Sequence, residues 1–403
     1  MVSDFLQHYI NLWWSCDRSF PDFGITTSLK DQNENEKKLE KLINSLVYQF
    51  KRIPRSPDER IAWQEGIRPG FIEFARIALH LQPYQLDFIE TSGFLDANIE
   101  FARMARKFDP HISGEAIYQA GRNVMTSNFF QLLLGLPVAV PPSVFAYSML
   151  YPYTDNYLDD PFVPTATKRT FIQRFFKRLQ GKAVQLENPQ EEIIDNLVQM
   201  IEDQWDRSQY PQVYESLLAI HTAQGSSLGL TLPGASPFEL DVLGISFEKG
   251  GTSVLADGYL VAGNLTSEQA KMMFGYGAFT QLIDDLEDIE QDFREGRMTI
   301  FSQTASHWPL DNLTNRLFFF GREIMGDLTA FHSPSVPALA GVISHSIDPI
   351  LIDTIGRAGK YYSKGYLHEI EQKCSFRFGF LRKQREKLFH QKIDFGKIVD
   401  AMI

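Results

Sequence analysis

The chain has 403 residues, of which 44% are hydrophobic and 22% are charged. This composition is typical of a globular protein with a core, and it excludes a disordered or collagen-like chain. The formal net charge of −11 at pH 7 disfavours binding to nucleic acid or to anionic lipid, because both carry negative charge.

The cysteines and the first residues indicate the compartment. Cys16 and Cys374 lie far apart and neither belongs to a C-x-x-C pair, so neither a disulfide framework nor a structural zinc site is predicted. The start, MVSDFLQHYINLWW, lacks the basic residues and the apolar run of a signal peptide. We therefore expect a cytoplasmic protein.

Helical periodicity runs along nearly the whole sequence and predicts an all-α fold, a single large helical bundle. The polar run 30–38 separates an aromatic-rich start from the rest, so we expect residues 1–50 to form an N-terminal helical arm and residues 51–403 one α domain. In chain order, the expected helices cover 36–50, 58–80, 84–107, 113–134, 143–160, 167–181, 189–208, 211–223, 252–263, 267–294, 311–328, 336–346, 349–369 and 376–390.

One stretch, residues 129–150, is uncharged and long enough to suggest a membrane span. It contains Gly135, Pro137, Pro141 and Pro142, which would interrupt the backbone hydrogen bonds of a single lipid-exposed helix. We predict two buried helices joined by a proline-rich turn, and no transmembrane segment.

The helix expected from Ser267 carries Asp284, Asp288 and Asp292 at i, i+4 and i+8, so the three carboxylates are predicted to share one face. No Lys or Arg precedes the first two by three or four residues, and the helix dipole disfavours acids in the last turns. A divalent cation would offset this repulsion. A solvated acidic face is the simpler explanation, but the preceding segment 274–279 is apolar, as expected for a buried helix.

A second acidic cluster follows the same spacing. Asp155 and Asp159 are four residues apart, and Asp160 and Pro161 end the expected helix. Alone, this cluster is best explained as a solvated helix end. Two acid-bearing helix ends that faced each other across a cavity would hold several Mg²⁺ ions, and these would bind a diphosphate.

The segment QLIDDLEDIEQDFREGR resembles the second aspartate-rich motif of class I isoprenoid synthases, especially the squalene and phytoene synthases. It is also similar to the (N/D)-D-L-x-(S/T)-x-x-x-E motif of terpene cyclases, with Asp284 in the first position. DNYLDD is similar to the first motif of the squalene/phytoene group and of the bacterial large-terpene synthases. The positions that match the squalene and phytoene synthase motif are Gln281, Leu282, Leu286, Asp288, Asp292, Gly296 and Arg297.

The resemblance implies a set of site residues. The Mg²⁺ ligands would be Asp155, Asp159, Asp284, Asp288 and Asp292. Lys249 with Thr252 resembles the Lys-Thr pair that contacts diphosphate in prenyltransferases, Arg297 matches the family arginine, and Arg357 resembles the C-terminal arginine of bacterial cyclases. The simpler explanation for Lys249 is an ordinary surface lysine. The simpler explanation for Arg297 is a cation that interacts with the dipole at the C-terminal end of the helix.

The fold implied by the resemblance places helices around a deep apolar cavity with the acids at its mouth. From the acid-bearing helices we expect Phe145, Met149, Phe274 and Phe279 to line that cavity, with Gln281 near the substrate. The implied activity is that of a terpene synthase, a Mg²⁺-dependent lyase that ionises a prenyl diphosphate and rearranges the resulting cation. Several Mg²⁺ ions would bridge to the diphosphate.

Two alternatives remain. The first is a prenyltransferase of the head-to-head type; chain elongation is less favoured, because only GIRPG at 66–70 approaches the G-G-K-R-x-R-P signature of elongating enzymes. The second is a non-catalytic helical scaffold that binds a metal ion or a basic partner. Substrate chain length, product skeleton and oligomeric state stay open, with a homodimer as one option.

Overall fold

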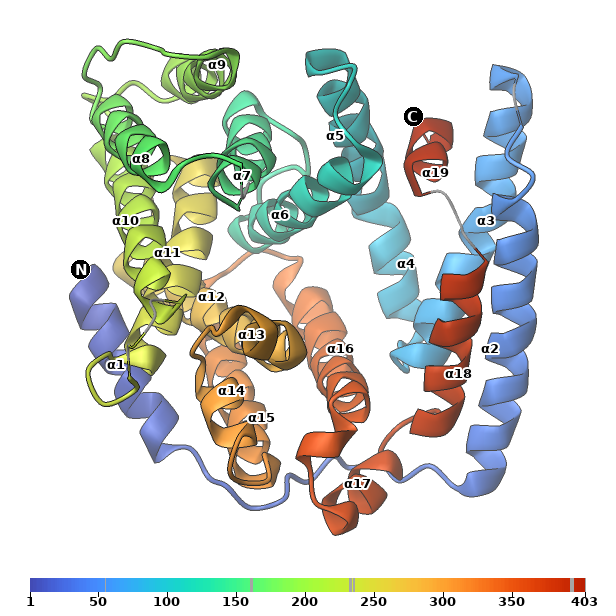
Figure 1. Cartoon of the computed structure of the whole chain (residues 1–403). Coiled ribbons are helices and arrows are strands. Elements are labelled where there is room, and N and C mark those ends of the chain that lie inside the picture. The colour runs from blue at the N-terminus through green and yellow to red at the C-terminus, as the bar shows by residue number, and fades with distance from the viewer. Residues whose placement is uncertain (55, 160–161, 232–233, 235, 392–394, 403) are drawn as a thin grey trace.

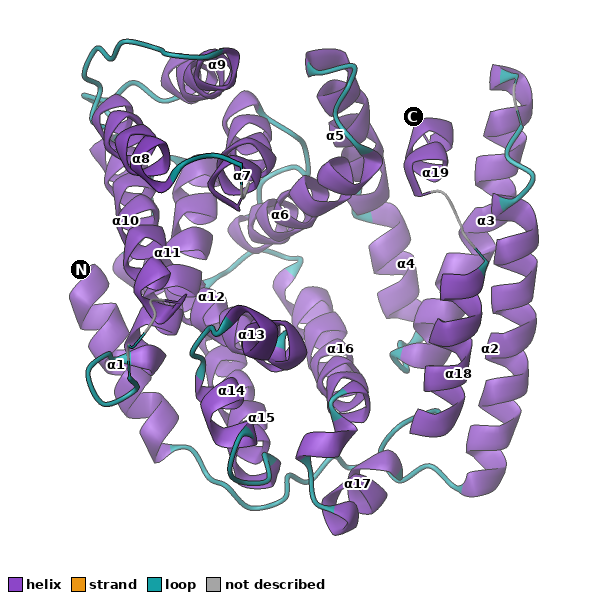
Figure 2. Ribbon diagram, viewed as in Figure 1, coloured by secondary structure: helices purple, strands orange, loops and turns teal. Residues whose placement is uncertain are grey.

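The computed structural model describes residues 1–403 except 55, 160–161, 232–233, 235, 392–394 and 403. The side chains of residues 57, 155–156, 159, 165 and 395 also lie outside the described part. The described residues form helices and loops, with no strand among them, which confirms the predicted all-α fold (Figures 1 and 2).

The helices follow one another through mostly short connections, and short 3-10 turns follow α10, α15 and α16. Their bounds are α1 Val2–Ser15, α2 Leu29–Phe50, α3 Pro57–Ala78, α4 Pro83–Thr91, α5 Phe94–Phe108, α6 Gly114–Leu134, α7 Pro142–Asp159, α8 Thr165–Leu179, α9 Pro189–Gln204, α10 Pro211–Ser227, α11 Val242–Ala262, α12 Ser267–Glu287, α13 Ile289–Glu295, α14 Ile300–Ala305, α15 Asp311–Gly326, α16 Val336–Arg357, α17 Lys364–Glu371, α18 Phe378–His390 and α19 Phe395–Met402.

Helices α11 and α12 form the centre of the core. Most side chains of α11 are buried, as expected for a helix that is apolar on nearly all sides. It packs against α6, α7, α10 and α12, and α12 packs in turn against α15 and α16. Helix α11 is thus enclosed by other helices, and α12 connects it to α15 and α16.

The first fifty residues, expected as an arm, supply two helices with different surroundings. Helix α1 packs against α11, α12 and α15, and its Tyr9 and Trp13 are fully buried. Tyr9 also donates a hydrogen bond of 2.9 Å to the carbonyl oxygen of Lys271 in α12. Helix α2 packs against α3 on the other side of the molecule (Figure 1). Helix α1 thus belongs to the main hydrophobic core.

Several predicted boundaries hold and others shift. The stretch 129–150 contains the end of α6 and the start of α7, as predicted, and Gly135 ends α6 with a φ of 73°. The helix expected over 84–107 is divided at Gly93, where φ is 86°. The helix expected over 267–294 is interrupted at Asp288, so that α12 ends at Glu287 and α13 begins at Ile289.

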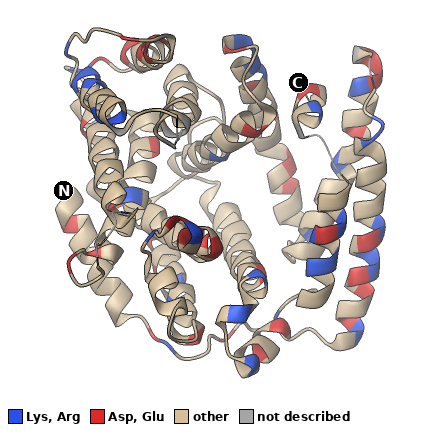
Figure 3. Ribbon diagram, in the orientation of Figure 1, with Lys and Arg blue, Asp and Glu red and all other residues tan. Residues whose placement is uncertain are grey.

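One helix of the described chain, α16, is long and apolar enough to cross a membrane when only length and composition are considered. Its mean hydropathy over the best window is 1.3. Only 28% of that window is buried in the structure, and length and composition alone are weak evidence for a membrane span. Charged residues are concentrated on two other helices, α2 and α18, which lie side by side in Figure 3.

Candidate active site

A pocket of about 270 Å³ lies where α7, α8, α10, α11, α12 and α13 meet. This volume is just below the usual range for small-molecule sites. Its charged lining residues come from α11, α12, α13 and the segment that follows α13, whereas α7, α8 and α10 contribute mainly apolar or neutral side chains. The pocket therefore has charged and apolar walls.

Besides Glu295, which lies 3.4 Å from Arg297, the acidic lining consists of Asp285, Asp288 and Asp292, with Gln281 one turn before Asp285. These positions are separated by four, three and four residues, which is the spacing of one helix face. The face continues through the interruption at Asp288, because the amide of Asp292 still donates a hydrogen bond of 2.8 Å to the Asp288 carbonyl. The carboxylates of Asp285, Asp288 and Asp292 thus line the same pocket from one helix face.

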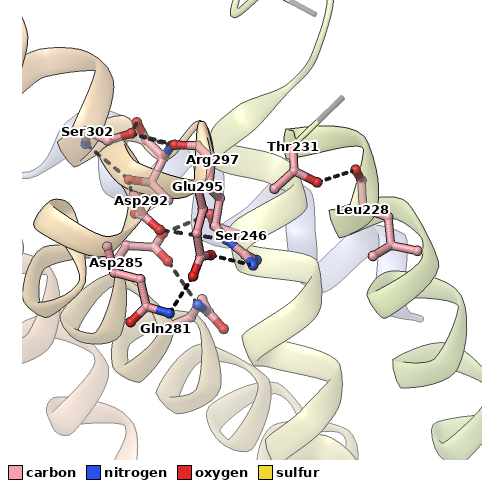
Figure 4. Close-up of polar contacts among 11 residues, drawn as sticks. Leu228, Thr231, Ser246, Gln281, Asp285, Asp292, Glu295, Arg297 and Ser302 are labelled. Atoms are coloured by element: carbon pink, nitrogen blue, oxygen red, sulfur yellow. Dashed lines mark hydrogen bonds and ion pairs between the residues drawn. The ribbon is translucent and has the colours of Figure 1, made fainter. Parts of the chain in front are cut away.

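Asp285 is held by hydrogen bonds from two helices. Its carboxylate accepts one bond of 2.9 Å from Gln281 Nε2 and another of 2.9 Å from the Ser246 hydroxyl of α11 (Figure 4). The side chain is buried, and this burial raises the pKa of Asp285 above its usual value. The carboxylate is therefore fixed in place, and a bound cation would favour its ionised form.

Asp292 lies beside the turn that ends α13. Gly296 has a φ of 68°, which is strained for other residues, and the turn brings Arg297 back so that its Nε lies 3.7 Å from Asp292 Oδ1. Thr299 donates a bond of 3.2 Å to the other carboxylate oxygen. Burial, followed by the nearby charge of Asp285, raises the pKa of Asp292 to about 7.

Lys249 supplies a second cation to the same pocket. Within the described part of the chain, its ammonium group has no ion-pair or hydrogen-bond partner, so it is available to an anion. The sequence suggested that Lys249 lies next to a helix start near residue 252. Helix α11 instead begins at Val242, capped by the Asp241 side chain, and Lys249 lies two turns inside it.

The apolar wall was not predicted. It comes from α8 and its surroundings, where Phe171, Ile172 and Phe175 line the pocket together with Leu158 and Leu230. The first three belong to the aromatic run FIQRFF on an amphipathic helix. Such a run is a sequence signal that could have indicated this wall.

Asp284 does not line the pocket, although it was predicted as a metal ligand. It is half-buried on a different face of α12, where its Oδ1 lies 3.5 Å from the Arg122 guanidinium of α6. Successive residues of a helix point about 100° apart, so only one of two adjacent aspartates can face the pocket. Asp285 takes the place that the motif comparison gave to Asp284.

The other predicted ligands, Asp155 and Asp159, have side chains outside the described residues. Helix α7, which carries them, borders the pocket through Tyr151, Thr154 and Leu158. Both acid-bearing helices of the sequence prediction therefore contribute to the lining of one pocket.

The four apolar residues expected to line a cavity lie in the packed core instead. Phe145 contacts Phe101 and Phe108, and Phe274 contacts Phe5 and Tyr9. Apolar side chains on buried helices fill a core as readily as they line a cavity, so their type alone does not distinguish the two. None of the four lines the pocket: Phe145, Met149, Phe274 and Phe279.

Two further predicted substrate contacts lie elsewhere. Thr252 is fully buried in α11 and donates a hydrogen bond of 2.6 Å to the carbonyl of Glu248. Arg357 forms ion pairs with Glu287 and Asp353 outside the pocket. Of the predicted site residues that are described, those brought together are Lys249, Gln281, Asp288, Asp292 and Arg297.

The donors of the pocket fit Mg²⁺ in kind. Carboxylates are its preferred protein ligands, and Mg²⁺ usually takes one or two of them and completes its shell with water and substrate phosphates. Among the described residues, no three His, Cys, Asp or Glu side chains lie close enough to form a metal site by themselves. A metal bound by Asp285, Asp288 or Asp292 would therefore need further ligands, such as water or phosphate oxygens.

Comparison with known proteins does not place the chain in a family. No protein-family model matches it, and no curated protein matches it. The pocket and the sequence motifs are therefore the observations that bear on function.

Proposed function

We propose that this protein is a Mg²⁺-dependent terpene synthase of the class I isoprenoid type, which ionises one prenyl diphosphate. The observation that carries the proposal is the pocket in which three carboxylates of α12 and α13 and two cations, Lys249 and Arg297, share a space with an aromatic wall. A prenyl diphosphate has an anionic end, which would match the charged groups, and an apolar chain, which would match the aromatic wall.

The diphosphate end would lie against the charged lining. Asp285, Asp288 and Asp292 would hold Mg²⁺, which when bound supplies positive charge to the leaving group. Lys249 and Arg297 would donate hydrogen bonds to diphosphate oxygens. The carbon–oxygen bond then breaks with its electron pair on the diphosphate, and an allylic cation remains.

The apolar end would protect that cation. Phe171 and Phe175 present aromatic rings to the pocket, and aromatic faces attract a positive charge. Leu158 and Ile172 add apolar side chains to this end of the pocket, which a bound prenyl chain would cover. Exclusion of water lets the cation cyclise or rearrange before it is quenched.

The pocket volume of about 270 Å³ supports one prenyl substrate rather than two. The test is incubation with C10 to C25 prenyl diphosphates and Mg²⁺, with released diphosphate measured and products analysed by mass. A hydrocarbon or alcohol with the carbon number of the substrate is expected. Products with the summed carbon number of two substrates would favour a prenyltransferase, and no diphosphate release from any substrate would refute the proposal.

A further inference from the structure

His221 is a pocket residue that the proposed ionisation step does not use. It lies on α10 and lines the pocket together with Phe171 and Phe175 of α8. Its ring meets the Phe175 ring edge to face, with centroids 5.2 Å apart, and Phe176 stacks near it at 5.6 Å. The imidazole is therefore held in one orientation within the aromatic wall.

A hydrogen bond to the backbone determines which ring nitrogen carries the proton. His221 Nε2 lies 3.2 Å from the carbonyl oxygen of Ile172. A carbonyl oxygen only accepts hydrogen bonds, so Nε2 carries the hydrogen and Nδ1 of the neutral ring keeps its lone pair. Burial lowers the pKa of His221, which favours this neutral form.

The lone pair on Nδ1 has no partner in the part of the chain that the structure describes. Other bases that line the same pocket are carboxylates of α12 and α13, and the proposed function assigns three of these, Asp285, Asp288 and Asp292, to Mg²⁺. His221 instead lies with the aromatic side chains, where the cation would be held. A neutral nitrogen base thus belongs to the wall that would contact the hydrocarbon.

We propose that His221 Nδ1 accepts the proton that ends the reaction, an inference that rests on the proposed function. The lone pair takes a proton from a carbon next to the cationic centre, and the electrons of that carbon–hydrogen bond become the new carbon–carbon double bond. The cation becomes a neutral olefin, and His221 becomes an imidazolium. The imidazolium then returns its proton to the released diphosphate or to water.

Two substitutions separate this role from a structural one. His221→Gln keeps a donor near the position of Nε2 for the Ile172 carbonyl but has no basic nitrogen, and His221→Phe keeps an aromatic ring. The matched control is Phe176→Leu, which loosens the packing of the imidazole but leaves Nδ1 in place. Released diphosphate and olefin products are measured for each variant, together with the melting temperature.

The expected result is that both His221 variants form at least tenfold less of the wild-type olefin per diphosphate released, since a positioned base contributes about 10²- to 10⁴-fold. Phe176→Leu should keep the wild-type product pattern. An unchanged pattern in both His221 variants would overturn the inference, and so would a wild-type product that is entirely an alcohol. A wild-type protein that releases no diphosphate would refute the proposed function as well.

Discussion

Asp284 and Asp285 are adjacent in the chain but have different surroundings. Asp284 is half-buried and lies near Arg122, outside the pocket. Asp285 is buried, lines the pocket and accepts hydrogen bonds from Gln281 and Ser246. The pair therefore offers two substitutions of the same chemistry, one inside and one outside the site.

We predict that Asp285→Asn lowers diphosphate release by about 10²-fold or more, because it removes a charge that would hold Mg²⁺. Its thermal stability should be unchanged or higher, since burial of this carboxylate disfavours its ionised form. Steady-state turnover and the melting temperature without metal measure the two effects.

Asp284→Asn is the control and should keep turnover within about threefold, because this half-buried carboxylate lies outside the pocket and its 3.5 Å pair with the exposed Arg122 contributes little. If Asp284→Asn abolished turnover while Asp285→Asn did not, the placement of the site on the Asp285 face would be contradicted.

At the scale of elements, α11 and α12 approach so closely that their backbones touch. A Cβ atom added at Gly250 would lie 2.3 Å from the Gly277 carbonyl oxygen and 2.5 Å from the Cβ of Gln281. Lys249 and Gln281 line the pocket from these two helices. The spacing of the helices therefore sets the distance between the cation and the acidic face.

We predict that Gly250→Ala destabilises the fold by about 2–3 kcal/mol, because overpacking forces the backbones apart. It should also weaken diphosphate binding, since Lys249 and Gln281 move with their helices. The control is Gly379→Ala in α18, where an added Cβ meets nothing within 4 Å. Chemical denaturation of both variants checks the prediction, and equal stabilities would contradict it.

Helices α6 and α11 are joined by a buried carboxylate. Asp257 Oδ1 accepts hydrogen bonds of 2.9 Å from Asn123 and 3.0 Å from Ser127. Burial raises the pKa of Asp257 to about 8, so the folded protein keeps this group protonated at neutral pH.

The sign of the pH effect follows from proton linkage. Between about pH 4 and pH 8 the folded state holds a proton that the unfolded state has released, so stability declines as pH rises. Asp257→Asn keeps both hydrogen bonds and has no such proton. We predict that the variant gains stability relative to the wild type from pH 5 to pH 9, as measured by chemical denaturation. A constant difference across this range would contradict the pKa assignment.

The sequence predicted which segments are helical better than where the helices begin and end. The helix expected from residue 252 begins at Val242 instead, and Gly250 and Gly251 allow close packing inside it. The acidic spacing predicted one shared face, but the choice between Asp284 and Asp285 depends on which neighbours surround α12. The aromatic wall on α8 carries no motif, since its role arises from its position opposite α12 and α13.

At the scale of the whole molecule, α18 near the C-terminus packs beside α2 near the N-terminus. Arg377, just before α18, donates hydrogen bonds to the buried Glu36 carboxylate from its backbone amide at 3.0 Å and from Nε at 2.9 Å. Further along the two helices, Lys387 Nζ of α18 lies 3.6 Å from Glu40 Oε1 of α2. Basic residues of the C-terminal segment thus meet acidic residues of α2.

We predict that Arg377→Met destabilises the fold by about 2 kcal/mol, because it leaves the buried Glu36 carboxylate without its guanidinium partner. Lys387→Met should cost at most about 0.5 kcal/mol, since its pair with Glu40 is exposed. Although burial acts to raise the pKa of Glu36, the hydrogen bonds from Arg377 outweigh it and hold the pKa below its usual value.

The contribution of this pair is therefore present above the unfolded pKa of a glutamate and is lost as pH falls. Chemical denaturation of the wild type and of both variants at pH 7 and pH 3 measures the loss of stability and its dependence on pH. A cost for Arg377→Met that is the same at both values would contradict the pairing.

We propose that Asp285, Asp288 and Asp292 form a joint site for Mg²⁺ and diphosphate. Its most direct test is thermal melting with Mg²⁺, with inorganic diphosphate and with both. Because each ligand would complete the other's site, we predict that both together raise the melting temperature by more than the sum of the separate shifts. The excess should persist in Asp284→Asn and disappear in Asp285→Asn. Additive shifts in the wild type, or an undiminished excess in Asp285→Asn, would contradict the claim.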